Sequence, residues 1–352
     1  MFIAAPHLGV MNRIPCLMAG VMLLAACTSE STETAVAPVD DYHVTGNCAM
    51  TLSQEDQALK AAKHAEPGVT MVELSNGYSV FTQQYGESED VKVLVLHGGP
   101  ACTHEYMLNV AYQMPGHEGL ADVGDAEVHM YDQLGSFYSD QPSEDLWNIE
   151  RWVEEVDEVR RALGMDSTNF YLLGNSNGGS MVQRLGCDHP ERFAAVAIMI
   201  YQMPPGHACG PEQPLPMFHY YGDLDDGVPA DGQPSPYGWI YTSAKENTRI
   251  WAEAMACEGP AVSWQTPLTR EHGLHCEAFS RCGREGAEVV SCGDPLAGHE
   301  WQAQRILAIP SDCVAPAQAQ DLPRQPRCPA MSSPQALWGM EVVWQFLSRY
   351  SS

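Results

Sequence analysis

The sequence contains few basic residues. Lysine and arginine together number 18, against 45 aspartates and glutamates, and the formal net charge is −27 over 352 residues. A protein that binds nucleic acid needs a basic surface to neutralise phosphates, so we expect no nucleic-acid partner. The acidic excess favours solubility and says little about the chemistry.

The hydrophobic run at the N-terminus is too short to span a bilayer comfortably. Residues 14–26 are mostly apolar and follow Arg13, whereas a membrane-spanning helix needs about 20 such residues. The run ends in Leu24-Ala25-Ala26-Cys27, which resembles the bacterial lipobox. This resemblance implies a signal peptide over residues 1–26, cleavage before Cys27 and attachment of lipid to the Cys27 sulfur. The alternative is an ordinary secretory signal with an incidental cysteine.

The next segment, residues 27–47, has few large apolar residues and many Ser, Thr, Glu, Asp and Pro residues. This composition predicts a flexible tether. Residues 48–352 are enough for one α/β domain with insertions. We therefore expect an extracytoplasmic protein that a lipid anchor holds at a bacterial membrane, on the outer membrane or the periplasmic face. No oligomeric state is predicted.

The chain has 12 cysteines, and ten remain when Cys16 and Cys27 are set aside. An even number of cysteines in a chain bound for an oxidising compartment predicts disulfides. The alternative is a metal site formed by His272, His275 and Cys276. Their spacing matches no recognised ligand pattern, so we expect no metal.

The stretch 169–181 is the part around which the chain is organised. The apolar run 170–173 predicts a buried strand, Gly174-Asn175-Ser176-Asn177-Gly178 fits G-x-S-x-G, and a helix-like apolar spacing follows. Strand, sharp turn and helix are the context of a nucleophile elbow, in which backbones crowd the serine and favour glycine. Ser176 would then lie at a helix N-terminus, which favours developing negative charge. The alternative is a chance match to a common motif.

Strand-like and helix-like segments alternate along most of the chain. The runs 69–74 and 78–85 predict a hairpin, because Asn76-Gly77 joins them. Further strands are predicted at 91–96, 126–131, 193–200, 216–221, 279–281 and 287–291, and helices at 149–163, 242–255 and 333–348. Alternation of this kind predicts a mostly parallel, doubly wound α/β sheet with helices on both faces.

The helix over 149–163 is predicted to be amphipathic. Its apolar stripe comprises Ile149, Trp152, Val153, Val156, Val159, Ala162 and Leu163. Glutamate and arginine fill the opposite face, which we expect to be exposed. Three segments are predicted as loops or lids, namely 202–215, 230–285 and a Pro-rich loop over 302–331 that a Cys313–Cys328 disulfide could close.

The turn after strand 91–96 reads His97-Gly98-Gly99-Pro100. A glycine pair lets backbone N–H groups approach a ligand, as in the oxyanion hole of a serine hydrolase. The amides of Gly99 and Asn177 are the predicted donors, since Pro100 has no N–H. We expect His97 to shape this loop. The alternative is a plain tight turn.

The base and acid that Ser176 requires follow it in the order Ser, Asp/Glu, His. Of the histidines beyond the acid, His272, His275 and His299, we prefer His299 because it lies in a loop after the last apparent strand. The loop after strand 216–221 offers three acids, Asp223, Asp225 and Asp226. The spacing alone leaves the choice among them open.

From residue 169 onward the chain resembles the polyhydroxybutyrate depolymerase-like esterases, which include feruloyl esterase relatives. The matching segments are 174–181, 184–187, 190–197, 222–229 and Gly298-His299-x-Trp301. The resemblance implies an α/β-hydrolase fold with Asp225 as the acid and His299 as the base. Gln302 stands where that family usually has proline.

The preceding part resembles the proline iminopeptidases. The matching residues are His97 to Pro100, Tyr131 to Ser136 with Ser139-Asp140, and 147–164. Those enzymes share the α/β-hydrolase fold and triad, and bind the substrate's free amino terminus with acidic residues from a helical cap. Here the corresponding gap, 202–215, is too short for a large helical cap. Asn177 also stands where that family commonly has tryptophan.

Together these features predict a serine hydrolase that cleaves carboxylic esters through an acyl-enzyme, with the triad Ser176, Asp225 and His299 and no cofactor. The expected partners are a small or oligomeric ester substrate and the membrane that holds the lipid anchor. Two alternatives remain, an aminopeptidase of the proline iminopeptidase type and a non-catalytic binding lipoprotein.

Overall fold

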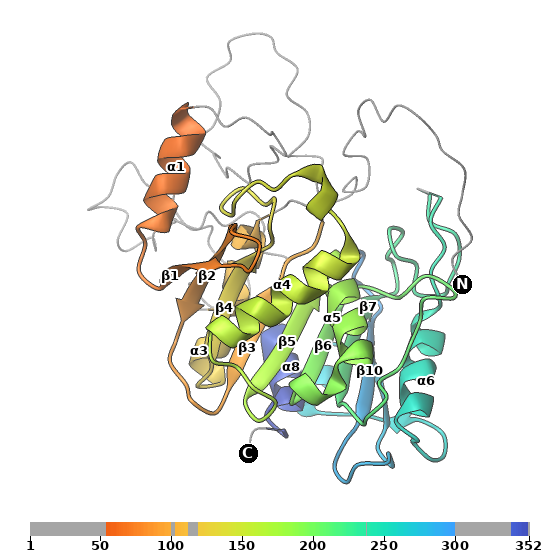
Figure 1. Cartoon of the computed structure of the whole chain (residues 1–352). Coiled ribbons are helices and arrows are strands. Elements are labelled where there is room, and N and C mark those ends of the chain that lie inside the picture. Colours follow the sequence, from red (N-terminus) through yellow and green to blue (C-terminus); the bar gives the residue numbers. More distant parts are fainter. Residues whose placement is uncertain (1–53, 100–102, 112–118, 237, 300–338, 351–352) are drawn as a thin grey trace, which may run out of the picture.

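The computed structural model describes residues 54–99, 103–111, 119–236, 238–299 and 339–350. Ten strands of this part form one sheet, in the order β1-β2-β4-β3-β5-β6-β7-β10-β9-β8 (Figure 1). The six strands from β4 to β10 in this order pair in parallel, and two antiparallel strands flank them at each edge. The predicted mostly parallel, doubly wound α/β sheet is therefore confirmed.

The central strands are buried on both faces. In chain order the strands are β1 (Val69–Glu73), β2 (Ser79–Tyr85), β3 (Lys92–Leu96), β4 (Glu127–Asp132), β5 (Phe170–Asn175), β6 (Ala195–Met199), β7 (Met217–Gly222), β8 (Val262–Ser263), β9 (His275–Phe279) and β10 (Val289–Asp294). Every residue of β4, β5, β6, β7 and β10 is buried. Continuous apolar runs of this kind are typical of parallel strands that helices cover on both sides.

Helices cover both faces of the sheet (Figure 1). They are α1 (Gln54–His64), α2 (Leu108–Ala111), α3 (Leu120–Val123), α4 (Ile149–Ala162), α5 (Asn177–Asp188), α6 (Ala244–Ala254), α7 (Pro267–Glu271) and α8 (Gly339–Leu347). One apolar core joins α2, α3 and α8 to the sheet, and a second joins α4, α5 and α6 to the other face. A sheet between two packed layers of helices is the architecture that the alternation of strands and helices predicted.

The predicted hairpin is confirmed. β1 and β2 pair antiparallel, and Gly77 in the connecting turn has φ of 83°, a conformation that glycine adopts without steric cost. The segment between β6 and β7, all of which the structure describes, contains turns and no helix.

Two strand predictions near the far edge of the sheet need correction. The strand predicted at 279–281 is wrong, because β9 ends at Phe279 and begins at His275. Its exposed and buried residues alternate, so only one side of β9 is apolar, and the sequence carries no continuous apolar run there. β10 also extends to Asp294, beyond the predicted end at residue 291, because it pairs in parallel with the whole of β7.

The buried face predicted for α4 is also partly wrong. Val156 and Val159 are buried as predicted, but so are Arg151 and Glu155, while Ile149 is 56% exposed. Glu155 is buried because it accepts hydrogen bonds from the Tyr131 hydroxyl and from the backbone N–H of Leu134, 2.8 Å away. Periodicity cannot show this, since it treats every carboxylate as a solvated group.

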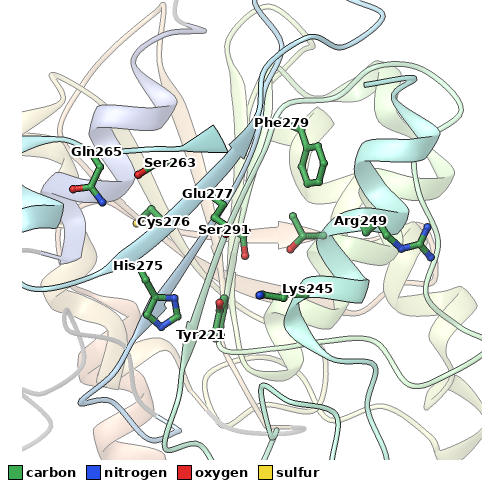
Figure 2. A pocket seen from close by; sticks show the side chains of 11 residues that line it. Tyr221, Lys245, Arg249, Ser263, Gln265, His275, Cys276, Glu277, Phe279 and Ser291 are labelled. Atoms are coloured by element: carbon green, nitrogen blue, oxygen red, sulfur yellow. The ribbon is translucent and has the colours of Figure 1, made fainter. Parts of the chain in front are cut away.

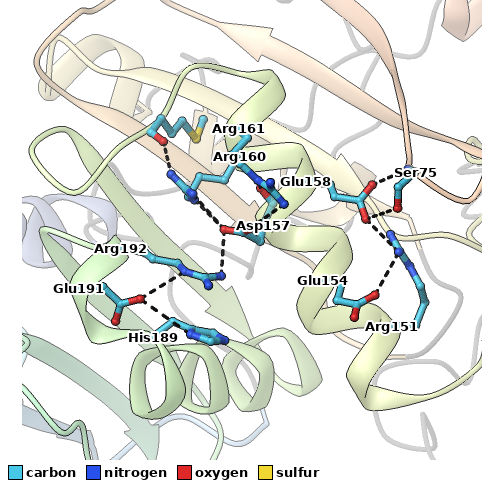
Figure 3. Close-up of polar contacts among 11 residues, drawn as sticks. Ser75, Arg151, Glu154, Asp157, Glu158, Arg160, Arg161, His189, Glu191 and Arg192 are labelled. Carbon is cyan, nitrogen blue, oxygen red and sulfur yellow. Dashed lines mark hydrogen bonds and ion pairs between the residues drawn. The ribbon is translucent and has the colours of Figure 1, made fainter.

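Ion pairs fix α4 to its neighbours (Figure 3). Arg151 contacts Glu158 at 2.9 Å, and Glu158 in turn accepts a hydrogen bond from the Ser75 hydroxyl at 2.9 Å. Asp157 lies between Arg160 of the same helix and Arg192, at 3.0 and 2.9 Å. Because Ser75 and Arg192 are distant in sequence from α4, these contacts orient the helix on the sheet.

Three disulfides lie in the described part of the chain, Cys187–Cys209, Cys257–Cys282 and Cys276–Cys292. Cys276 is therefore not available as a thiolate ligand in the suggested metal site. Among the described residues no group of three or more His, Cys, Asp or Glu side chains could hold a metal ion. The remaining predicted disulfide cysteines, Cys48, Cys102, Cys313 and Cys328, lie outside the described residues.

The predictions for the N-terminus concern residues that the structure does not describe. The signal peptide 1–26, the lipid-bearing Cys27, and the tether 27–47 remain predictions. Within the described ranges, no helix is both long and apolar enough to cross a membrane.

Candidate active site

Ser176 lies at the sharp turn between β5 and α5. Its φ of 51° and ψ of −122° are unusual for a residue with a side chain, and such strain is concentrated at functional sites. The flanking glycines permit the turn. A Cβ at Gly174 would clash with the carbonyl oxygen of Gly178, and a Cβ at Gly178 would clash with the carbonyl oxygen of Leu96. Steric crowding therefore explains the glycines on both sides of the serine.

The structure brings Ser176, His299 and Asp225 together. The Ser176 Oγ is 2.9 Å from His299 Nε2, and His299 Nδ1 is 2.7 Å from Asp225 Oδ2. If Nδ1 donates to Asp225, Nε2 is left to accept the serine proton, which is the arrangement that a general base requires. The Asp225 side chain is 2% exposed and that of His299 is 19% exposed, so the base lies nearer to solvent than the acid.

The three acids of the loop after β7 lie in different environments. Asp225 is buried, and its second oxygen accepts a hydrogen bond from the Val228 N–H at 2.8 Å. Asp223 and Asp226 are exposed, and Asp223 pairs with His275 at 2.7 Å. Only Asp225 contacts His299 among these three, so the geometry favours the acid that the family resemblance implied.

The Gly98–Gly99 turn lies beside the serine. A Cβ at Gly98 would lie 2.9 Å from the Ser176 Cβ, and Gly99 has φ of 65°. The Gly98 N–H donates to the Tyr106 hydroxyl, which leaves the Gly99 N–H as the candidate donor of this loop. Asn177 is the first residue of α5, so its N–H has no carbonyl four residues earlier within the helix. Both amides suggested for the oxyanion hole thus lie next to Ser176 in the chain or in space.

His97 contacts the loops on either side of the site. It is buried, its Nδ1 is 3.0 Å from the Gly98 carbonyl oxygen, and its Nε2 is 3.4 Å from the Gln133 N–H nitrogen and 3.3 Å from the Ser136 Oγ. Burial lowers the pKa of His97, which favours the neutral ring. These contacts agree with the expectation that His97 shapes the turn.

The arrangement of these elements was compared with known protein families. The family model described as the alpha/beta hydrolase fold matches residues 92–253. The fold is that of the α/β hydrolases. The strand order, the turn at Ser176 and the chain order of Ser176, Asp225 and His299 agree with that fold.

The relatives found by sequence include proline iminopeptidases. The enzyme of Elizabethkingia meningoseptica is 42% identical over 124 residues, which cover 34% of this chain and 39% of the relative. That of Clostridium botulinum is 30% identical over 209 residues, which cover 57% and 66%. Among solved structures, the proline iminopeptidase of Mycobacterium smegmatis is 27% identical with a TM-score of 0.32, and covers 37% of this chain and 42% of that one. The chain therefore spans less than half the length of the first of these relatives, and the predicted resemblance to them is confirmed.

A buried contact between Asp132 and His104 was not predicted from the sequence. Asp132, at the end of β4, accepts from the His104 backbone N–H at 2.7 Å and lies 2.9 Å from His104 Nδ1. Both side chains are fully buried, and the His104 ring stacks on Phe81 at 5.0 Å. The pair holds the 3₁₀ turn His104–Met107, which carries Tyr106 to Gly98. Neither residue has a sequence signal of its own, since the two lie 28 positions apart.

Glu155 of α4 also stabilises the surroundings of the site, and this role was not predicted from the sequence. Burial raises the pKa of Glu155 to about 7. Its hydrogen bonds to Tyr131 and Leu134 hold the loop that follows β4, and the same loop contacts His97 through Gln133 and Ser136. A single buried carboxylate thus connects α4 to the turn beside the serine.

Proposed function

We propose that this hydrolase acts by acyl transfer through Ser176. The observation that carries the proposal is the continuous contact from Ser176 through His299 to the buried Asp225. Ser176 attacks the carbonyl carbon, and His299 takes the serine proton and returns it to the leaving group, while Asp225 holds the imidazole. The amides of Gly99 and Asn177 stabilise the oxyanion. Water then attacks the acyl-enzyme, with His299 again acting as base, and releases the acid.

We infer that the substrate is an amide next to a free amine, so that the protein is an aminopeptidase of the proline iminopeptidase type. The similarity to proline iminopeptidases supports this inference over the ester hydrolase that motif patterns favoured. The segments whose sequence resembles proline iminopeptidases include the turn after β3 and the loop after β4, which contact each other through His97 and Gln133. The support is partial, because the chain covers 39% of the Elizabethkingia meningoseptica enzyme.

One observation keeps ester hydrolysis as the second candidate. The segment between β6 and β7 has no helix, whereas the helical cap of proline iminopeptidases is inserted there and supplies the acids that bind the substrate amine. A site that lacks a helix in this segment suits a carboxylic ester, which needs no amine recognition. Carboxylates that replace those acids would have to come from another segment.

One experiment distinguishes the aminopeptidase from the ester hydrolase. The protein is assayed with proline p-nitroanilide, its N-acetylated form and p-nitrophenyl butyrate. Cleavage of the anilide that needs the free amine supports the aminopeptidase. Cleavage of the butyrate alone supports the esterase.

Variants then test whether Ser176 is responsible. We expect Ser176→Ala to lower turnover by roughly 10⁴-fold or more, because the nucleophile is lost. Ser143→Ala, an exposed serine that caps no helix through its side chain, is the matched control and should keep the full rate. A Ser176→Ala protein with full turnover would overturn the mechanism. Failure of Ser176 to react with a fluorophosphonate probe would support a non-catalytic binding protein.

A further inference from the structure

A second cavity lies between α6 and the outer strands of the sheet. Its volume is about 490 Å³, and strands β7, β9 and β10 form its floor, while α6 forms one wall (Figure 2). The mechanism proposed for Ser176 uses none of the side chains that line it. The six that matter for its chemistry are Tyr221, Lys245, His275, Glu277, Phe279 and Ser291.

One end of this cavity presents hydrogen-bond donors and a positive charge. Lys245 extends from α6 toward Tyr221 of β7 and Ser291 of β10 (Figure 2). Tyr221 and Ser291 are each only 8% exposed. Neither hydroxyl makes a hydrogen bond with the residues that the structure describes, although both line the cavity. Burial, with Asp223 and Glu277 nearby, raises the pKa of Tyr221 to about 12, so its hydroxyl keeps its proton and can donate.

The other charges around the cavity differ in whether they are already paired. His275 is bound to Asp223 at 2.7 Å, and Arg249 points away from the cavity to pair with Glu246 and Glu253. In the described part of the chain, neither Lys245 nor Glu277 takes part in an ion pair, with each other or with a third residue. The cavity therefore holds one unpaired cation and one unpaired carboxylate.

An apolar surface accompanies these two charges. Phe279 lies on the same side of β9 as Glu277, because residues two apart in a strand face the same way. The Tyr221 ring, which also lines the cavity, extends this surface. Concave sites that combine apolar walls with a few placed polar groups are typical binding sites for small molecules.

We propose that this cavity binds a free amino acid with an apolar side chain. Its carboxylate accepts hydrogen bonds from Lys245, Tyr221 and Ser291, its ammonium group pairs with Glu277, and its side chain packs on Phe279. A ligand with both charges satisfies both unpaired groups, whereas a simple anion would leave Glu277 unpaired and repelled. The proposal does not rest on the function of Ser176, since no bond is made or broken here.

Calorimetry with three matched ligands tests the proposal on the full chain. Leucine carries both charges, N-acetyl-leucine only the carboxylate, and leucine amide only the ammonium. We expect leucine to bind at least about tenfold more tightly than either derivative, the loss expected for one charge-assisted hydrogen bond. Absence of leucine binding, or equal affinity for N-acetyl-leucine, would overturn the proposal. Equal affinity for the dipeptide leucyl-leucine would also overturn it, because the ligand would then be a peptide terminus.

Variants locate the binding site. Lys245→Met should weaken leucine binding at least about tenfold, and Glu277→Gln should do so for leucine but not for N-acetyl-leucine. Both positions are exposed, so the fold should tolerate the changes. Arg161→Gln and Glu154→Gln on α4 are the charge-matched controls and should leave leucine binding unchanged. Unchanged leucine affinity in Lys245→Met would overturn the assignment.

Measuring turnover of the ester or anilide substrate distinguishes a failure of the leucine site from a failure of the proposed Ser176 mechanism. We expect Lys245→Met to leave kcat unchanged, because Lys245 lies outside the triad and the oxyanion turn. A loss of turnover together with leucine binding would overturn the proposal of a separate site. Binding of leucine by a chain that cleaves neither substrate would support it while the proposed function failed.

Discussion

The two sides of Ser176 are held in different ways. On the elbow side, backbone crowding fixes the turn, and the contacts involve residues 174–178 and the end of β3. On the oxyanion side, the turn 97–99 is supported by buried polar side chains from β4, the turn His104–Met107 and α4. Backbone crowding at the elbow can be predicted from a short motif. The polar contacts around the turn 97–99 come from residues that lie far apart in the chain.

The largest loss of stability is expected at the elbow, where backbone crowding fixes the turn. Gly178→Ala places a Cβ against the Leu96 carbonyl oxygen, and because both atoms belong to backbone elements neither can move away cheaply. We expect the free energy of unfolding to fall by more than about 4 kcal/mol, measured by urea denaturation. Gly206→Ala is the control, because a Cβ at Gly206 would meet open space, although its φ of 81° is strained for a residue with a side chain. It should lose only about 1 kcal/mol, and equal losses would contradict the steric explanation.

The next effect concerns the pH dependence of stability on the oxyanion side. The pKa of Glu155 in the folded protein, about 7, lies above its ordinary value of 4.5. The folded state therefore holds the proton more tightly, so the stabilisation is complete below pH 4.5 and is lost as the pH rises through 7. Glu155→Gln cannot titrate. Between these two pH values the wild type should lose about 2–3 kcal/mol relative to this variant.

Urea denaturation of both proteins across this pH range measures the difference. Glu154→Gln, on the exposed face of the same helix, is the control and should follow the wild-type profile. Parallel profiles for the wild type and Glu155→Gln would show that the burial of Glu155 does not support the loop after β4 in the way we describe.

The smallest effect is expected at Tyr106. Tyr106→Phe removes the hydroxyl that accepts the Gly98 N–H, so the turn beside Ser176 loses one hydrogen bond. The loss of about 1–1.5 kcal/mol should lower kcat roughly tenfold, with KM little changed, if the turn acts mainly in the transition state. The Tyr78→Phe variant, a tyrosine in the β1–β2 turn, should keep the wild-type kcat. A tenfold rise in KM with unchanged kcat would place Tyr106 in substrate binding.

Much of the fold could be predicted because its determinants are local. The elbow, the β1–β2 hairpin and the buried parallel strands each have a signal within about ten neighbouring residues. The chain order of the triad narrowed the base to three histidines, and the position of His299 after the last apparent strand favoured it among them. The acid could not be chosen in this way. Spacing left three aspartates as candidates, and only a family resemblance favoured Asp225.

The wrong predictions for the buried face of α4 and for the position of β9 share one physical cause. For α4, periodicity placed Arg151 and Glu155 on the solvent face, yet both are buried. Glu155 accepts a hydrogen bond from Leu134, and Arg151 contacts Glu158 of the same helix, which in turn binds Ser75. For β9, half of the strand is exposed, and its place beside β10 comes from long-range pairing with that strand. A polar side chain carries no local mark that shows whether its partner will lie beside it in the fold.

The sequence by itself determined the strand and helix alternation, the strained turn at Ser176 and the residue types of the triad, because these depend on steric limits and apolar runs between near neighbours. Only the tertiary structure decided which polar groups are buried and paired. It joined His104 to Asp132 and Glu155 to the loop after β4, and it left Lys245 and Glu277 unpaired across one cavity. The physical reason is that the strength of a charge or hydrogen bond depends on its surroundings, and distant segments supply those surroundings.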